Sequence, residues 1–280
     1  MMTSPFTASI CAISTVVAAA VAADPFPLAI YYGIPSLVNG AAGDVDRATE
    51  TFRAYDVVVF GDGLEFDDIV PDRKPSGAGP EEHQRTRAII AHLAAVSPRT
   101  KVFGYVDLGR TQQLPLDELQ SRVRRWQSMG VAGIFFDEAG TDFGVDRPRL
   151  HAAVEAAHAA DLRVALNAFD PDDVFAAMRD IPPPRIGPGD AYLLESFAVR
   201  DGRIDLSPAS RERLAKARAG TAATGAALWA VTTTQADYDP ALMDHAWRAA
   251  TDAGVECFGW GEPFFGSIDS RLPFRLRPLR

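Results

Sequence analysis

The sequence predicts a single (β/α)8 barrel, and three observations lead to this fold class. The chain has 280 residues, and a barrel of this kind needs about 250. From Pro25 onward, short apolar runs alternate with longer amphipathic stretches, an order typical of βαβ units around a parallel sheet. The apolar runs number eight, and this favours a closed barrel over an open, doubly wound sheet.

The predicted strands are near-continuous apolar runs, as expected of strands that are covered on both faces. In chain order they are Leu28–Gly33, Asp56–Phe60, Lys101–Asp107, Gly133–Asp137, Arg163–Asn167, Ala191–Glu195, Ala227–Thr232 and Glu256–Trp260. The first run contains no G-x-G-x-x-G, and the chain has no G-x-x-x-x-G-K-S/T. A dinucleotide-binding fold and a P-loop therefore have no support in this sequence.

Helices are predicted between the strands from the spacing of apolar residues and from signals at the helix ends. The stretch Leu116–Met129 carries Leu119, Val123 and Trp126 at helical spacing, and Gly130 follows it as a C-cap. The other predicted helices are Glu81–Ala95, Pro148–Ala160, Pro171–Met178, Ser207–Ala219 and Pro240–Ala253.

The chain is predicted to be one catalytic domain over residues 24–280, preceded by a signal peptide over residues 1–23. The apolar run Ile10–Ala22 ends in small residues and is shorter than the about 20 residues that span a bilayer. This pattern predicts a secreted or cell-surface protein without a membrane span. Because no Lys or Arg precedes the run, an Ala-rich tail or a misassigned start codon is the alternative. Strand–helix units continue on both sides of Pro71–Pro80 and Ile181–Gly189, so these stretches are predicted loops and not linkers.

The composition argues against several classes of partner and cofactor. The formal net charge of −9 disfavours a nucleic-acid partner and is compatible with a cationic or neutral ligand, or with solubility alone. The spacing of Cys11 and Cys257 excludes a cysteine-based zinc site, and the five histidines all fall in predicted helices. No metal and no cofactor are therefore expected. The absence of G-x-S-x-G disfavours serine esterase chemistry, and no feature indicates an oligomeric state.

Carboxylates end three of the predicted strands, those of Asp107, Asp137 and Glu195, at the barrel face where active sites form. Asp137 and Glu138 directly follow an apolar run, and Glu195 ends another. Adjacent strand residues face opposite sides, so at most one of Asp137 and Glu138 faces the cleft; the sequence leaves open which one. The strands of Asp137 and Glu195 are separated by one strand, so their ends can lie across one cleft.

Two carboxyl groups flanking a sugar bond are the usual equipment of glycoside hydrolysis. We expect Asp137 to act as nucleophile or base and Glu195 as general acid, with Glu138 in reserve. The sequence leaves open whether the mechanism is retaining or inverting, and whether the enzyme cleaves within the polymer chain or from its end. Substrate is expected to contact further polar and aromatic residues at the strand ends, although each could instead bind a loop or belong to the core: Tyr32, Asp62, Tyr105, Asp107, Asn167, Trp260 and Glu262.

Several of these runs resemble the endo-α-1,4-polygalactosaminidase and spherulin-4-like glycosidase clan, over roughly the first six strands. The runs are Tyr31–Gly33, Tyr55–Val59, Val102–Val106 and Gly130–Glu138. The resemblance implies a secreted or surface-anchored enzyme that cleaves galactosamine-containing microbial polysaccharide, with Asp137 as the strand-4 acid and Glu195 as the strand-6 acid. The part from Leu206 onward has no matching motif. The alternatives are a non-catalytic carbohydrate-binding barrel and a glycosidase of this clan that acts on another polymer.

Overall fold

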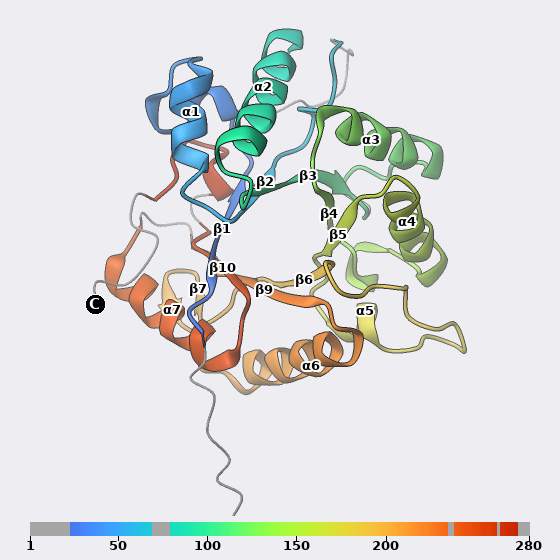
Figure 1. The fold of residues 1–280 in the computed structure, drawn as a ribbon. Coiled ribbons are helices and arrows are strands. Elements are labelled where there is room, and N and C mark those ends of the chain that lie inside the picture. Colours follow the sequence, from blue (N-terminus) through green and yellow to red (C-terminus); the bar gives the residue numbers. More distant parts are fainter. Residues whose placement is uncertain (1–22, 69–78, 235–237, 262–263, 274–280) are drawn as a thin grey trace, which may run out of the picture.

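Eight parallel strands close into a barrel in the computed structural model, which describes residues 23–68, 79–234, 238–261 and 264–273. Around the barrel they are β1 (Phe26–Tyr31), β2 (Val57–Phe60), β3 (Lys101–Asp107), β4 (Gly133–Asp137), β5 (Arg163–Leu166), β6 (Ala191–Leu194), β9 (Ala227–Val231) and β10 (Cys257–Gly259), which pairs again with β1 (Figure 1). The predicted (β/α)8 barrel is confirmed, and so is each of its eight strands. The residues of the predicted signal peptide before position 23 lie outside the described part.

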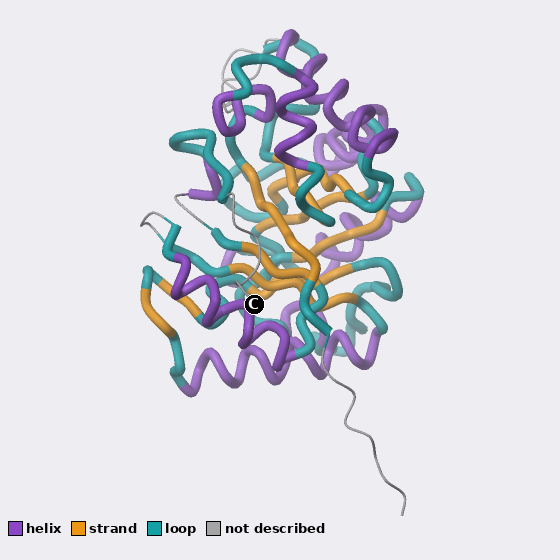
Figure 2. The backbone as a smooth tube through the Cα atoms, turned by 60° about the vertical axis from the view of Figure 1, so that its left-hand side comes forward, coloured by secondary structure: helices purple, strands orange, loops and turns teal. Residues whose placement is uncertain are grey.

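Helices surround the barrel on its outside, as Figures 1 and 2 show from two directions. They are α1 (Val45–Phe52), α2 (Pro80–Val96), α3 (Leu116–Met129), α4 (Arg147–Ala159), α5 (Asp172–Phe175), α6 (Pro208–Thr224) and α7 (Pro240–Ala253), with 3-10 turns at Pro35–Gly40, Thr141–Phe143 and Phe264–Gly266. All six predicted helices are present, although α5 is much shorter than predicted. Within the described ranges, no helix has the length and apolar character needed to cross a membrane.

Two elements were not expected from the sequence. One is α1, whose N-cap Asp44 accepts hydrogen bonds from the backbone N–H groups of Asp46 and Arg47. This capping aspartate was an available signal for the helix. The other is a short antiparallel hairpin after β6, formed by β7 (Val199–Arg200) and β8 (Arg203–Ile204). Strands of two residues carry too little periodic pattern to be recognised in a sequence.

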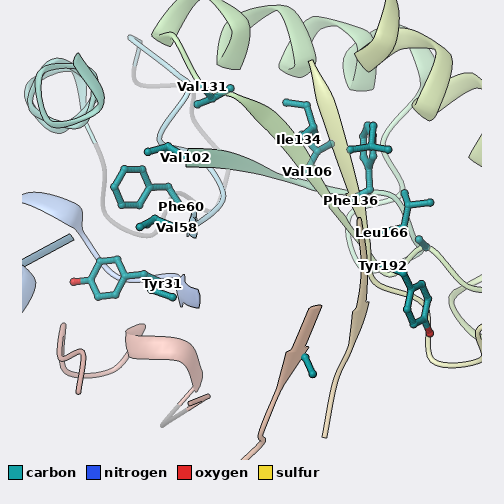
Figure 3. Close-up of a cluster of buried hydrophobic side chains, with 14 of the residues drawn as sticks. Tyr31, Val58, Phe60, Val102, Val106, Val131, Ile134, Phe136, Leu166 and Tyr192 are labelled. Atoms are coloured by element: carbon teal, nitrogen blue, oxygen red, sulfur yellow. The ribbon is translucent and has the colours of Figure 1, made fainter. Parts of the chain in front are cut away.

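Side chains alternate across the barrel wall and divide the core into two clusters. One cluster, which includes Phe103, Phe135 and Trp229, is made of strand residues and fills the barrel. The other includes Phe136 and helix residues such as Trp126, so it packs between the strands and the helices (Figure 3). The structure thereby decides which residues of β4 face inward, a question that the sequence left open. Residues in step with Phe135 face the interior of the barrel, and residues in step with Phe136 face the helices.

Gly104 lies on the outward face of β3, where the indole of Trp126 from α3 covers it. A Cβ atom at position 104 would lie 2.1 Å from Trp126 Cδ2. The indole Nε1 donates a hydrogen bond of 2.9 Å to the carbonyl of Tyr105, which holds the ring against the strand. The absent side chain at Gly104 therefore sets how closely α3 packs on β3.

We expect Gly104→Ala to destabilise the protein by about 1–3 kcal/mol, because the added methyl group overpacks the Trp126 contact. Urea unfolding followed by far-UV circular dichroism measures this change. The control is Gly79→Ala, since a Cβ at Gly79 meets no atom within 4 Å. Equal stability of the two variants would contradict this account of how α3 packs.

Candidate active site

Three neighbouring strands place polar side chains on the inner face of the barrel at its C-terminal end. Asp137 ends β4 in step with the inward Phe135. Asn167 follows β5 in step with Ala165, and Glu195 follows β6 in step with Leu193, both of which belong to the inner cluster. Strand alternation therefore directs all three side chains to the mouth of the barrel.

A single side-chain amide connects the two acids. Asn167 Nδ2 donates a hydrogen bond of 2.8 Å to Asp137 Oδ1 and one of 3.3 Å to Glu195 Oε2. Two oxygens that share one nitrogen at hydrogen-bond distance lie at most about 6 Å apart. The structure thus brings together the carboxyl groups of β4 and β6, which are 58 positions apart in the sequence.

The surroundings of Asp137 raise its pKa to about 6. Burial is the largest cause, and the negative charge of Glu195 adds to it. Hydrogen bonds from the backbone N–H of Glu138 (2.9 Å), from Asn167 and from the Tyr105 hydroxyl act in the opposite direction, because they favour the ionised form. Asp137 is thus an oriented carboxyl group that titrates close to neutral pH.

Tyr32 and Tyr105 form an aromatic wall beside the pair. Their ring centroids lie 5.2 Å apart in an edge-to-face arrangement, and Phe265 packs against Tyr32 at 5.4 Å. Burial and the nearby charge of Asp137 raise the pKa of both tyrosine hydroxyls, which stay neutral donors at physiological pH. Both predicted substrate-binding tyrosines therefore lie next to the two acids.

Asp107 is a third carboxyl group next to Asp137. The two residues are register partners on β3 and β4, and Asp107 is only 1% exposed. Burial raises the pKa of Asp107 to about 7, with further contributions from the charges of Glu138 and Asp137. Within the described residues, its Oδ1 has no hydrogen-bond partner. Asp107 therefore adds to the wall of the site a carboxyl group that is partly protonated at neutral pH.

Glu138 has the opposite orientation to Asp137. Its backbone takes a left-handed conformation (φ 52°). Its carboxylate accepts hydrogen bonds from the backbone N–H of Thr111, at 3.1 Å, and from the Thr111 hydroxyl. A side chain at Gly109 would collide with this carboxylate, since its Cβ would lie 2.4 Å from Glu138 Oε2. Glu138 thus fastens the loop after β3 and does not join the Asp137–Glu195 pair.

Asp62 belongs to a group of charges between the end of β2 and α3. It forms a salt bridge with Arg122 and accepts a hydrogen bond of 2.8 Å from Gln112 Nε2. Arg122 Nη1 also lies 3.5 Å from a carboxylate oxygen of the buried Glu65. Burial and the charge of Asp62 raise the pKa of Glu65 to about 8, and Arg122 opposes this shift. Asp62 therefore has structural partners that the sequence could not indicate.

Trp260 does not line the inside of the barrel. It is 6% exposed in the outer cluster, and its ring centroid lies 5.6 Å from that of Tyr238. Trp260 is in step with the outward Phe258 of β10, which removes it from the candidate substrate surface. Glu262, the remaining predicted contact, lies outside the described residues.

Sequence reasoning missed Arg213, which lies near Glu195, and Phe169, whose ring lies 4.1 Å from the Arg213 guanidinium. Arg213 and Glu195 both line a cavity of about 200 Å³ at the ends of β6 and α6. The available signal was an aromatic residue two positions after Asn167, in the loop that follows the strand. In the part of the chain that the structure describes, no group of three or more His, Cys, Asp or Glu residues could hold a metal ion.

Comparison with known proteins identifies similarity of fold. No protein-family model and no curated protein matches the chain. The glycoside hydrolase domain of PelA from Pseudomonas aeruginosa is 15% identical with a TM-score of 0.50, over 89% of this chain and 100% of that one. A variant of that domain is 14% identical to this chain, with a TM-score of 0.52 and the same coverage. The carboxyl transferase domain of Rhizobium etli pyruvate carboxylase is 11% identical, with a TM-score of 0.52 over 85% of this chain and 40% of that one. The chain shares a TIM-barrel fold with a glycoside hydrolase domain and with an enzyme of different chemistry.

The raised pKa of Glu65 makes stability depend on pH. The pKa of Glu65 is about 8 in the folded state, and the ordinary pKa of a glutamate is 4.5. Between these pH values the folded state binds more protons than the unfolded chain, so stability falls as pH rises through this window. We expect Glu65→Gln to remove this loss and to be more stable than wild type at pH 9 by an amount on the order of a few kcal/mol. Urea unfolding between pH 5 and pH 9 tests this.

The control is Glu81→Gln, which makes the same substitution at an exposed side chain on α2. Its stability should follow the wild-type pH dependence. A Glu65→Gln variant with that same pH dependence would show that Glu65 does not carry the buried proton.

Proposed function

We propose that this protein is a secreted glycoside hydrolase that cleaves a galactosamine-containing microbial polysaccharide with two carboxyl groups, Asp137 and Glu195. One observation carries the proposal: the amide of Asn167 joins both carboxyl groups at the mouth of the barrel. Conspicuous carboxylates at this face of the fold are usually catalytic. The resemblance of the strand-end motifs to the polygalactosaminidase clan supports the choice of substrate.

The hydrogen bonds assign different roles to the two acids. Asp137 accepts three hydrogen bonds, which orient its carboxylate and leave it ionised above a pH of about 6. An oriented carboxylate is suited to attack the anomeric carbon. Glu195 accepts the longer of the two bonds from Asn167 and lines the adjacent cavity, which suits a group that gives and takes a proton. Asp137 is the nucleophile and Glu195 the general acid in this scheme.

The separation of the acids favours a retaining mechanism. Retaining enzymes place their carboxyl groups about 5–5.5 Å apart, and inverting enzymes need roughly 6.5–9.5 Å to admit a water molecule. Because Asn167 Nδ2 binds one oxygen of each acid, these two oxygens lie at most about 6 Å apart, below the inverting range. The Asp137 oxygen forms a bond to the anomeric carbon while the glycosidic bond breaks, and Glu195 protonates the leaving oxygen. Water then cleaves the glycosyl ester, and Glu195 takes its proton.

The charge of the site is consistent with an amino-sugar polymer. Asp107 of β3, Asp137 of β4 and Glu195 directly after β6 lie at inner positions of the barrel mouth, and the whole chain carries a net charge of −9. Such a site attracts a chain with ammonium groups. Tyr32 and Tyr105 offer the aromatic surface and hydroxyl donors that sugar rings commonly contact.

A non-catalytic carbohydrate-binding barrel is the rival function, and a Glu195 side chain that points outward and pairs with an arginine such as Arg200 would favour it. In the described structure Arg200 instead lies 3.6 Å from Asp205. Glu195 accepts a hydrogen bond from Asn167 on the inner side. A binding module has no need to hold two acids against one amide, so these contacts favour catalysis.

We expect Asp137→Asn and Glu195→Gln each to lower kcat by about 10²–10⁴-fold or more, since each removes a group that acts on the reacting bond. Release of reducing ends from a panel of amino-sugar and neutral polysaccharides measures activity, and thermal unfolding should stay near wild type. Glu212→Gln, at an exposed position on α6, is the matched control. Full activity in either active-site variant would remove that residue from the mechanism.

The pKa of Asp137 predicts the acidic limb of the pH profile. Below a pH of about 6 Asp137 is protonated and cannot attack, so kcat/KM should rise with pH through this region. Asn167→Ala removes a hydrogen bond that favours the carboxylate, so the limb should move to higher pH. An unchanged limb in Asn167→Ala would contradict the assignment of this limb to Asp137.

A further inference from the structure

An exposed aromatic ring in the loop after β5 has no part in the proposed chemistry. Phe169 is 53% exposed, although large apolar side chains are normally buried. It lies in the bend after β5, two positions beyond Asn167, the residue that binds both acids.

Arg213 of α6 holds this ring in place. Its guanidinium carbon lies 4.1 Å from the centroid of the Phe169 ring, and its Nε donates a hydrogen bond of 2.9 Å to the Phe169 carbonyl. The Tyr192 hydroxyl donates to the preceding carbonyl, that of Ala168, at 2.6 Å. One face of the ring is therefore covered, its backbone is anchored at two carbonyls, and half of its surface stays open to solvent.

The same arginine connects the ring to the catalytic side of the cleft. Arg213 and Glu195 both line the cavity of about 200 Å³, together with Leu206 and Leu214. The negative charge of Glu195 also acts on the guanidinium and opposes the lowering of the Arg213 pKa by burial. Arg213 thus contacts the Phe169 ring and shares a cavity with Glu195, so it links the ring to the acid.

We propose that Phe169, backed by Arg213, is a subsite that binds a neutral pyranose ring of the substrate chain next to the bond being cleaved. The apolar C–H face of a sugar stacks on an aromatic ring, and a ring already held in position binds with little loss of entropy. That the sugar belongs to the cleaved polymer rests on the proposed function.

Charge decides between a neutral sugar and an amino sugar at this position. The attraction of a cation to an aromatic ring comes from the negative face of the ring, and Arg213 already occupies one face of Phe169. A second cation on the other face would meet a weakened quadrupole and the charge of Arg213. Glu195 and Asp170 both act on this guanidinium, and Lys216 shares Asp170, at 3.3 Å, and also lies 2.7 Å from Asp172. The subsite therefore favours rings without an ammonium group.

The test compares binding of two probes, an α-1,4-linked oligogalactoside and an α-1,4-linked oligogalactosamine of the same length. Titration calorimetry on the full chain measures binding. Every sample carries Asp137→Asn, so that the probes are not cleaved. Adding Phe169→Ala should weaken binding of the neutral probe by about five- to tenfold and change binding of the amino probe less than twofold. Phe169→Trp should retain binding of the neutral probe, whereas Phe169→Leu should behave like Phe169→Ala.

Phe26→Ala is the matched control, because Phe26 is 52% exposed and lies at the start of β1, at the opposite end of the barrel. Equal affinity of Phe169→Ala and Phe26→Ala for the neutral probe overturns the subsite. If the enzyme hydrolyses the polymer and Phe169→Ala changes neither KM nor the product lengths, the subsite fails while the role of the acids stands. Binding of the neutral probe that depends on Phe169, in a protein without hydrolytic activity, supports the subsite and overturns the proposed function.

Discussion

The hydrogen bonds from the Asn167 amide to Asp137 and Glu195 are the interaction on which the rest of the site depends. Two carboxyl groups that approach each other in a buried setting repel, unless donors or protons compensate them. The Asn167 backbone is itself held by the sheet, since its N–H donates to Phe136 and its carbonyl accepts from Ala139. The register of β4, β5 and β6 thus determines the distance between the acids.

Acidic groups are buried at two places near the C-terminal ends of the strands, the site around Asn167 and the charge group of Arg122, where the fold gains little from them. The pKa values of Glu65, Asp107 and Asp137 are all raised, and burial is the largest cause for each. Groups of this kind reduce stability near neutral pH, because the folded protein must either keep a proton or bury a charge. A barrel wall packed on both faces supplies the stability that tolerates them.

The barrel alone does not identify a reaction. A glycoside hydrolase domain and a carboxyl transferase domain share this architecture with the chain at 15% identity or less. Function on such a scaffold lies in the residues at the strand ends. The proposal therefore rests on the convergence of two acids on one amide, and Phe169 with Arg213 adds a distinct surface to the same cleft.

The sequence by itself determined the barrel, because apolar runs of strand length record burial on both faces, and it placed Asp137 and Glu195 at strand ends. Only the tertiary structure decided which side chains meet. It turned Glu138 toward Thr111, buried Trp260 outside the barrel, and joined residues far apart in the chain, such as Asp62 with Arg122 and Phe169 with Arg213. Strand phase and partner choice depend on packing between distant segments, and a local pattern carries no information about such contacts.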